Sequence, residues 1–311
     1  MNQQATFRGE LRSNEPMARH VSWRAGGPTA RAAWPLDVDD CATFLGSLPA
    51  NEEVMMVGLG SNLLVRDGGF DGTVVFTHGA LKKLQLEDDG TIYAEAGVAS
   101  PKVARFAATH DLSGAEFLAG IPGTIGGALA MNAGCYGAET WPVVERVLML
   151  GRDGERRVRT PAEFEIGYRH MRQLKGVGEV FAAAWLRFPK GDGEASRVRI
   201  RELLERRIST QPLQLANAGS VFRNPPGDHA ARLIEAAGLK GVKLGGAQVS
   251  EKHANFIVNP QGMASASEIE MLIGRIQVEV KQKFGVALEC EVRIVGNAKR
   301  NTNVSESEVK A

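Results

Sequence analysis

Glycine is concentrated in two short stretches of this chain. Of the 36 glycines among 311 residues, five lie in residues 58–72 and six in residues 120–137. Glycine allows the backbone to adopt positive φ angles and to come close to a ligand or to another element. Because the glycines follow no three-residue period, a collagen-like structure is excluded. The two stretches must fit within a globular fold, which a composition of 43% hydrophobic and 23% charged residues supports.

Charge and cysteine content exclude several classes of function. Lys and Arg number 37 against 36 Asp and Glu, a net charge of +1, so no global field attracts nucleic acid or a membrane surface. Cys41, Cys135 and Cys290 form no CxxC pair and the histidines show no ligand spacing, so we expect no disulfide framework and no metal. These features predict a cytoplasmic protein.

One uncharged stretch, residues 117–138, is long enough to cross a bilayer. It contains six glycines together with Pro122 and Asn132. We therefore expect a buried glycine-rich loop and helix rather than a membrane helix.

The order of strand and helix patterns predicts an α+β chain in three units followed by a polar tail. The boundaries are expected at residues 1–80, 81–192, 193–298 and 299–311. The expected helices are 38–48, 101–110 (with Ser100 as N-cap), 194–208, 229–237 and 265–284. The expected strands include 54–57, 72–76, 92–96, 143–151, 156–159, 180–188 and 287–295.

The first glycine stretch opens with the sequence GLGSNLL at residues 58–64, directly after a predicted strand. Successive backbone N–H groups in such a turn can form a nest for a phosphate. Leu63 stands where a dinucleotide fingerprint has its third glycine, and there is no Walker A motif. Taken alone, the motif is equally compatible with a simple tight turn.

The second stretch reads AGIPGTIGGA at residues 119–128 and continues as MNAGCYG at 131–137. Small residues are needed where backbone lies against an extended ligand, and a helix start can face a pyrophosphate. Close packing of a helix on a sheet requires the same residues. Two glycine clusters in one chain favour a large nucleotide cofactor more than either does alone.

Two polar motifs follow. Ser220 in AGSVFRNP, residues 218–225, could present a hydroxyl group beside a cation, but the motif is no hydrolase elbow. In ECEVR, residues 289–293, strand alternation places Glu289, Glu291 and Arg293 on one face, where they could line a cleft. An ordinary turn serine and a solvated strand face remain open alternatives.

In this order, the segments resemble the UDP-N-acetylenolpyruvoylglucosamine reductase family of bacterial cell-wall synthesis. The resemblance covers nearly all of the chain up to residue 296. Its further motifs are HVSWRAGG at 20–27, YR at 168–169, QP at 211–212, LIEAAGLKG at 233–241, VSEKHANF at 249–256 and EVRIVG at 291–296.

The resemblance implies an α+β fold with a two-part FAD-binding region of the vanillyl-alcohol-oxidase-like (PCMH) type and a C-terminal α/β substrate-binding domain. It assigns FAD to the units 1–80 and 81–192, and substrate to 193–298. The implied reaction is the reduction of UDP-N-acetylglucosamine-enolpyruvate to UDP-N-acetylmuramate, with noncovalent FAD and with NADPH as co-substrate.

The resemblance also implies roles for individual residues. Ser220 matches the proton donor, and Arg169 and Glu291 match the groups that stabilise an enolate-like intermediate. Since Glu291 helps an anion only when it is protonated or bridged through a donor, we expect its pKa to be raised. The implied FAD-binding residues are Arg24, Gly58, Leu59, Gly60, Ser61, Asn62, Leu63, Gly120, Ile121, Pro122, Gly123, Thr124, Gly126, Gly127 and Ala128. The implied substrate-binding residues are Tyr136, Arg207, Gln211, Asn224 and His253.

The chain departs from the family pattern at two positions. Met171 stands where a serine is common, and Cys290 stands where a proline is common. About fifty residues separate Arg169 from Ser220, which resembles the subclass without an additional loop over the substrate. Two other functions stay open: another FAD-dependent oxidase of the same fold, and a non-catalytic FAD- or nucleotide-binding protein. We expect a monomer or a weak homo-oligomer.

Overall fold

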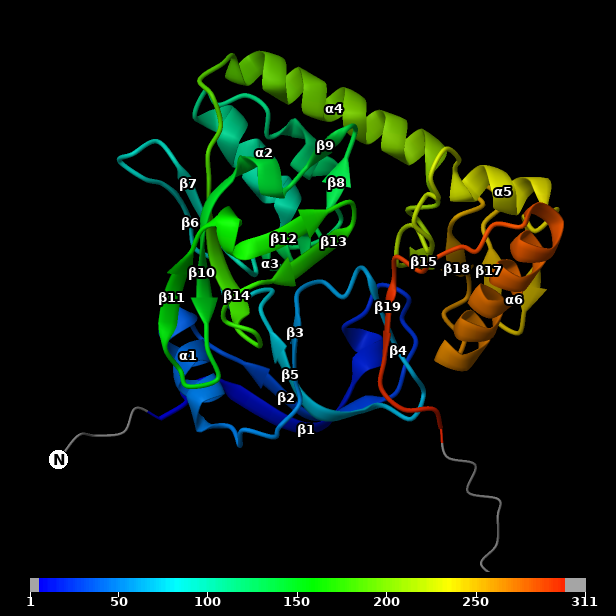
Figure 1. The fold of residues 1–311 in the computed structure, drawn as a ribbon, viewed down its shortest axis with the longest axis horizontal. Coiled ribbons are helices and arrows are strands. Elements are labelled where there is room, and N and C mark those ends of the chain that lie inside the picture. Colours follow the sequence, from blue (N-terminus) through cyan, green and yellow to red (C-terminus); the bar gives the residue numbers. More distant parts are fainter. Residues whose placement is uncertain (1–5, 300–311) are drawn as a thin grey trace, which may run out of the picture.

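The computed structural model describes residues 6–299, which form three larger sheets, three two-stranded sheets and their covering helices (Figure 1). The first sheet has the order β1-β2-β5-β3, with β1 antiparallel to β2 and the other pairs parallel. Helix α1 begins where the side chain of Asp37 accepts a hydrogen bond from the N–H of Asp40. The elements of this part are β1 (Glu10–Pro16), η1 (Met17–Arg19), β2 (Pro28–Trp34), α1 (Val38–Ser47), β3 (Val54–Val57), β4 (Leu63–Val65) and β5 (Phe70–Phe76).

The second sheet is antiparallel throughout, with the order β11-β10-β14-β7-β6. Helices α2 and α3 pack against it around a core that includes Ile92, Leu118 and Ile125. The elements are β6 (Leu84–Leu86), β7 (Ile92–Glu95), α2 (Ser100–Thr109), η2 (Glu116–Gly120), α3 (Ile125–Ala130), β8 (Gly134–Cys135), β9 (Ala138–Glu139), η3 (Trp141–Val143), β10 (Val144–Leu150), β11 (Arg156–Arg159), η4 (Pro161–Glu163), β12 (Phe164–Gly167), β13 (His170–Gln173) and β14 (Val180–Leu186).

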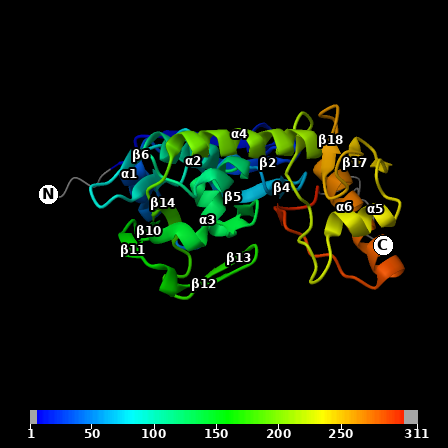
Figure 2. The same ribbon diagram turned by 90° about the horizontal axis from the view of Figure 1, so that it is seen from above.

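Helix α4 (Gly193–Thr210) runs from the second sheet to the third, along one side of the molecule (Figures 1 and 2). The third sheet, β15-β18-β17-β16, is antiparallel and is accompanied by two helices. The longer of these, α6, starts with a capping box between Ser265 and Glu268 and ends at Gly285 with φ of 71°. The elements are β15 (Ala216–Asn217), α5 (Ala230–Ala236), β16 (Lys243–Leu244), β17 (Ala247–Val249), β18 (Ile257–Asn259) and α6 (Ala266–Phe284).

The final strand returns to the first part of the chain. Strand β19 (Arg293–Val295) pairs in parallel with β4. The sequence predicts a longer strand over 287–295 within the third unit, and this is wrong in extent, because before β19 only an isolated bridge joins Cys290 to Phe222. As a result, the C-terminal segment lies beside the first glycine loop.

The predicted N-cap of α2 is also wrong. The N-cap residue is Ala99, which has no side chain that could cap, and Ser100 is the first helical residue. The N–H of Ser100 instead donates to the carbonyl of Gly123, 2.9 Å away, and its buried hydroxyl has no partner among the described residues. This position fixes the start of α2 to the second glycine stretch.

The uncharged stretch 117–138 forms η2, α3 and short strands, as the glycine content predicts. Within residues 6–299, no helix is both long enough and apolar enough to cross a membrane.

Candidate active site

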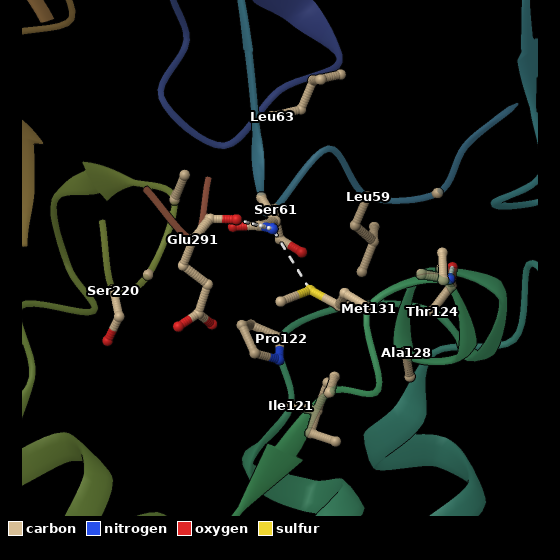
Figure 3. A pocket seen from close by; sticks show the side chains of 18 of the residues that line it. Leu59, Ser61, Leu63, Ile121, Pro122, Thr124, Ala128, Met131, Ser220 and Glu291 are labelled. Atoms are coloured by element: carbon tan, nitrogen blue, oxygen red, sulfur yellow. Dashed lines mark hydrogen bonds between the residues drawn. The ribbon is translucent and has the colours of Figure 1, made fainter. Parts of the chain in front are cut away.

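A cavity of about 440 Å³ lies between the two glycine stretches and the C-terminal segment. It is lined by residues 58–63, 120–124, Gly127 and Ala128, and by Ser220, Glu291 and Arg293 from the last third of the chain. Figure 3 shows Ser220 and Glu291 on one side of this cavity and Thr124 and Ala128 on the other. Thirteen of the fifteen residues expected to bind FAD therefore line one cavity.

The glycines of the first loop allow this close approach. A Cβ at Gly58 would lie 2.3 Å from Oγ1 of Thr124, so the two stretches could not meet with a larger residue there. Gly60 has φ of 59°, and a Cβ there would lie 2.2 Å from the carbonyl oxygen of His20. Gly58 is required by the packing of the first glycine stretch against the second, and Gly60 by the packing of the first stretch against His20 and Val21.

Two of the residues expected to bind FAD, Arg24 and Gly126, lie outside the cavity lining. Arg24 is exposed, with φ of 56°, and is absent from the wall. A Cβ at Gly126 would lie 2.8 Å from Cβ of Ala96, so this glycine serves the packing of α3 on the end of β7. At Gly126, close packing explains the glycine without a ligand.

Arg169 is held in a strained turn between β12 and β13. Its φ is 51°, a region that non-glycine residues rarely adopt. Its Nε donates to Oε1 of Glu291 at 3.1 Å, and its Nη2 donates to the carbonyl of Gly134 at 2.8 Å. The side chains of Arg169 and Glu291 are only 16% and 14% exposed, so this ion pair is largely shielded from water.

Burial raises the pKa of the Glu291 carboxyl, and the neighbouring Arg169 partly opposes this shift. This is the direction expected from the sequence. Desolvation disfavours the charged carboxylate, while the guanidinium favours it. Glu291 can therefore hold a proton at a higher pH than an exposed glutamate can.

The loop that carries Ser220 is held by hydrogen bonds on both sides of Val221. The N–H of Val221 donates to the carbonyl of Asn255 at 2.9 Å, and the carbonyl of Val221 accepts from the N–H of Glu291 at 2.8 Å. The side chain of Asn255 closes a second pair of hydrogen bonds with the backbone of Phe222. The hydroxyl of Ser220 is thus placed beside the segment that carries Glu291.

A second cavity, of about 470 Å³, adjoins the first along α4. Tyr136, Arg207 and Gln211 line both cavities, as befits residues expected to bind substrate. Nε of Arg207 donates to Oε1 of Gln211 at 2.9 Å, and burial lowers the pKa of this guanidinium. Arg199 and Arg206 also line the second cavity and were not expected from the sequence.

The other two residues expected to bind substrate do not reach either cavity wall. Oδ1 of Asn224 accepts from the N–H of Ala230, at the start of α5. His253 packs against Phe256 with ring centroids 4.7 Å apart, and burial lowers the pKa of its imidazole. In this structure, both side chains act within the third unit.

The two departures from the family pattern have local consequences only. Met171 packs against the apolar cluster of the second unit, so it does not touch Arg169 through a polar group. Cys290 packs against the core of the third unit, away from the cavity, which agrees with strand alternation. Glu289 is 77% exposed and also lies outside the cavity.

Several wall residues were missed by sequence reasoning. Arg293 lies on the predicted face with Glu291 but was given no role. Met55 and Met56 come from the end of β3, and Met131 and Phe256 are apolar residues with no chemical signature. Only the position of β3 directly before the first glycine motif could have drawn attention to the two methionines.

The cavity fits an extended nucleotide cofactor such as FAD. Among residues 6–299, no protein acceptor is recorded for the N–H groups of Leu59, Gly60 or Ser61, which suits phosphate oxygens. The nearest atom to a Cβ at Gly127 would be 3.8 Å away, so the backbone there leaves room at the wall. Free N–H groups at one loop and small residues opposite are what a pyrophosphate and a flat ring system require.

Comparison with known proteins identifies the family. A family model for an FAD binding domain matches residues 29–158, and one for the C-terminal domain of UDP-N-acetylenolpyruvoylglucosamine reductase matches residues 211–295. The chain is 56% identical over 303 residues to the UDP-N-acetylenolpyruvoylglucosamine reductase of Thiobacillus denitrificans, with 93% of each chain covered. It is 53% identical over 295 residues to that of Legionella pneumophila (strain Corby), with 94% of this chain and 95% of the other covered.

A solved structure agrees. The crystal structure of UDP-N-acetylenolpyruvylglucosamine reductase from Thermus caldophilus matches with a TM-score of 0.77 and 30% identity, covering 92% of this chain and 98% of the other. The expected fold class, an FAD-binding region followed by a C-terminal domain of this family, is therefore confirmed. The chain belongs to the UDP-N-acetylenolpyruvoylglucosamine reductase family.

Proposed function

We propose that Ser220, Arg169 and Glu291 together catalyse the reduction of the enolpyruvyl group of UDP-N-acetylglucosamine-enolpyruvate, for which NADPH supplies the electrons through FAD. As a family member, the chain is an FAD-dependent oxidoreductase of peptidoglycan precursor synthesis. The observation that carries the proposed roles is the shielded pair of Arg169 and Glu291, which shares one cavity with Ser220.

The chemistry requires groups of these types. Residues 58–62 and 120–124 would hold FAD, which would supply the methylene carbon of the enolpyruvyl group with a hydride that comes from NADPH. Negative charge then develops at the carbon that carries the carboxylate, and it needs stabilisation before a proton arrives. Arg169 supplies a fixed positive charge, and a protonated Glu291 donates a hydrogen bond to the same developing anion.

Ser220 completes the reaction by donating its hydroxyl proton to this carbon. A serine hydroxyl is a weak acid, so it donates only to a strongly basic carbanion. This order, with hydride first and proton second, is consistent with a loop that holds Ser220 close to Glu291. The product is UDP-N-acetylmuramate.

The rest of the substrate is assigned to the second cavity. Tyr136, Arg207 and Gln211 line both spaces and can bind the diphosphate and sugar. Arg207 has only the neutral Gln211 side chain as a recorded hydrogen-bond acceptor within residues 6–299. A buried guanidinium without a carboxylate beside it is well suited to an anionic ligand.

The chain's organisation and setting form a further part of the proposal. We assign FAD binding to residues 1–80 and 81–192 and substrate binding to 193–298, followed by a polar tail at 299–311, most of which lies outside the described residues. The three free cysteines support a reducing cytoplasm as the location. We propose a monomer or weak homo-oligomer.

A Ser220→Ala variant tests the proton donor. We expect NADPH to bleach the flavin absorbance as in the unchanged protein. Reoxidation by the enolpyruvyl substrate should slow by about 10²- to 10⁴-fold, the usual contribution of general acid catalysis. Stopped-flow spectroscopy measures both half-reactions, and Ser47→Ala, on the distant helix α1, is the control. Equal loss in both half-reactions would show that Ser220 acts in binding or folding rather than in proton transfer.

A further inference from the structure

The side chain of Asn62 does not simply face the cavity as expected of a cofactor ligand. Its Nδ2 donates to the backbone carbonyl of Glu291 at 3.1 Å and lies 3.4 Å from Sδ of Met131 (dashed lines in Figure 3). The backbone carbonyl of Asn62 accepts from the N–H of Arg293 at 3.0 Å. One residue of the first glycine loop thus holds the segment 291–293 at two points.

The bond to Glu291 defines the orientation of the amide. A backbone carbonyl only accepts hydrogen bonds, so the NH₂ group of Asn62 must face it. An aspartate at this position would place a carboxylate oxygen, which only accepts hydrogen bonds, against the carbonyl oxygen of Glu291. The interaction therefore depends on an amide rather than on a polar group of any kind.

Glu291 is consequently fixed by three separate parts of the fold. Its N–H donates to Val221, next to Ser220, and its carboxyl group accepts from Arg169. Its carbonyl accepts from Asn62. Of these three contacts, the one from Asn62 comes from the glycine loop that supplies the free N–H groups of the cavity.

We propose that Asn62 is a positioning residue that fixes Glu291 in the orientation needed to face the reacting carbon. This proposal rests on the catalytic role of Glu291 given above. It gives Asn62 a task distinct from binding FAD: it ties the cofactor loop to the carboxyl group that must meet the substrate. A buried carboxyl in a rigid setting loses effectiveness when its position shifts by even 1 Å.

A double-mutant cycle separates this role from cofactor binding. We expect Asn62→Ala and Asn62→Asp to lower the rate of flavin reoxidation by substrate on the order of 10- to 100-fold. The dissociation constant of FAD, measured from the recovery of flavin fluorescence on release, should change by less than about threefold. Asn62→His, which keeps an N–H donor at the δ position, should restore part of the rate.

The decisive measurement is made on a Glu291→Ala background, which removes the carboxyl group and leaves no hydrogen-bond donor in its place. If Asn62 acts through the carboxyl group of Glu291, Asn62→Ala should cause little further loss once that group is absent. Asn297→Ala is the matched control, because the amide of Asn297 ties the same terminal segment to Asp71 at 2.7 Å, outside the cavity. It should leave the rate unchanged.

Two results would overturn the proposal. If the losses from Asn62→Ala and Glu291→Ala multiply, Asn62 acts independently of the Glu291 side chain. If FAD dissociates more readily by the same factor as the rate falls, Asn62 is a cofactor ligand. A Glu291→Ala variant with an unchanged rate would instead contradict the proposed function itself, so the two failures are distinguishable.

Discussion

The balance at Glu291 between burial and a neighbouring charge is the central feature of the site at the scale of single residues. The carboxyl is shielded enough for its pKa to rise, yet it accepts a hydrogen bond from a guanidinium that favours its ionised form. Such opposed effects tune the acid strength of catalytic groups. In its protonated form, such a group can donate a hydrogen bond to an anion that forms only during the reaction.

The pH dependence of the reaction should report this group. Because the proposed role needs a protonated Glu291, reoxidation of the flavin by substrate should be fastest below its raised pKa. The rate should fall as pH rises through that pKa, approaching about tenfold per pH unit. Stopped-flow rates between about pH 5 and pH 9 would show this fall in rate, which forms the alkaline limb of the pH profile.

A substitution identifies the titrating group. Glu291→Gln keeps a neutral hydrogen-bond donor, so we expect a slower reaction without the alkaline limb. Glu289→Gln, two residues earlier and 77% exposed, should leave the limb in place. Persistence of the limb in Glu291→Gln would assign the titration to another residue.

The three residues for which the sequence predicts a catalytic role lie together in the structure. Ser220, Arg169 and Glu291 converge on one cavity although up to 122 positions separate them in the chain. Asn224 and His253 lie outside both cavity linings: Oδ1 of Asn224 accepts from the N–H of Ala230 at the start of α5, and Nδ1 of His253 accepts from the N–H of Asn255. A polar residue in a family motif has the same signature whether it contacts a ligand or supports the fold.

At the scale of elements, helix α3 shows two adjacent glycines with different tasks. A Cβ at Gly126 would meet Ala96, including its backbone oxygen at 3.1 Å. A Cβ at Gly127 would meet only Oγ1 of Thr124, at 3.8 Å, and this residue lines the cavity. One glycine permits packing, and the other leaves space for a ligand.

Alanine substitutions should separate these tasks. Gly126→Ala should destabilise the FAD-free protein by about 1–2 kcal/mol, since overpacking outweighs the gain in helix propensity. Gly127→Ala should leave thermal stability unchanged or slightly raised, but should weaken FAD binding through the added methyl group. Thermal unfolding of the FAD-free form and fluorescence titration with FAD measure the two effects. Equal losses of stability in both variants would contradict the distinction.

Element positions were largely predictable because hydrophobic periodicity and capping residues are local signals. Helix α6 begins after Ser265, as its capping box indicates, and α1 agrees with the prediction to within one residue at its end. Ser100 failed as an N-cap because a tertiary hydrogen bond to Gly123 determines where α2 begins. The pairing of β19 with β4 was not predictable either, because the sequence of a strand does not indicate which distant strand it will pair with.

At the scale of the whole molecule, the N-terminal part of the chain contributes to the core of the third unit. Trp23 is fully buried in the apolar cluster that also contains Phe222, Leu233 and Ile269. Its Nε1 donates to the carbonyl of Ile257 at 2.7 Å, and its own carbonyl accepts from the side chain of Asn259 at 3.0 Å. The proposed boundaries at residues 80 and 192 therefore do not separate independent cores.

The contacts between Arg66, Asp67 and α6 reinforce this connection. Arg66 forms a bidentate ion pair with Glu270, and the carboxylate of Asp67 accepts from the N–H groups of Ala266 and Ser267 at the start of α6. The ion pair is about one-third exposed, so it contributes only modestly, about 0.2–1 kcal/mol. Trp23 is the largest side chain of the first part in this cluster, where Ala25 and Leu64 are also buried, and the pairing of β19 with β4 adds a further connection.

A Trp23→Ala variant should therefore loosen the third unit, although Trp23 touches neither cavity. We expect a loss of about 3–5 kcal/mol from the free energy of unfolding of that unit, the usual cost of emptying a large core site. Hydrogen exchange should show reduced protection in α5 and α6, with protection in β10 and β14 largely kept. Trp23→Phe, which keeps most of the volume but leaves the carbonyl of Ile257 unpaired, should lose about 1–3 kcal/mol of the free energy of unfolding.

Because Val221 and Phe222 belong to the same cluster as Trp23, the Ser220 loop should lose its fixed position in Trp23→Ala, and substrate turnover should fall while FAD remains bound. Uniform loss of protection across both parts, or none in either, would show that Trp23 does not connect them in this way.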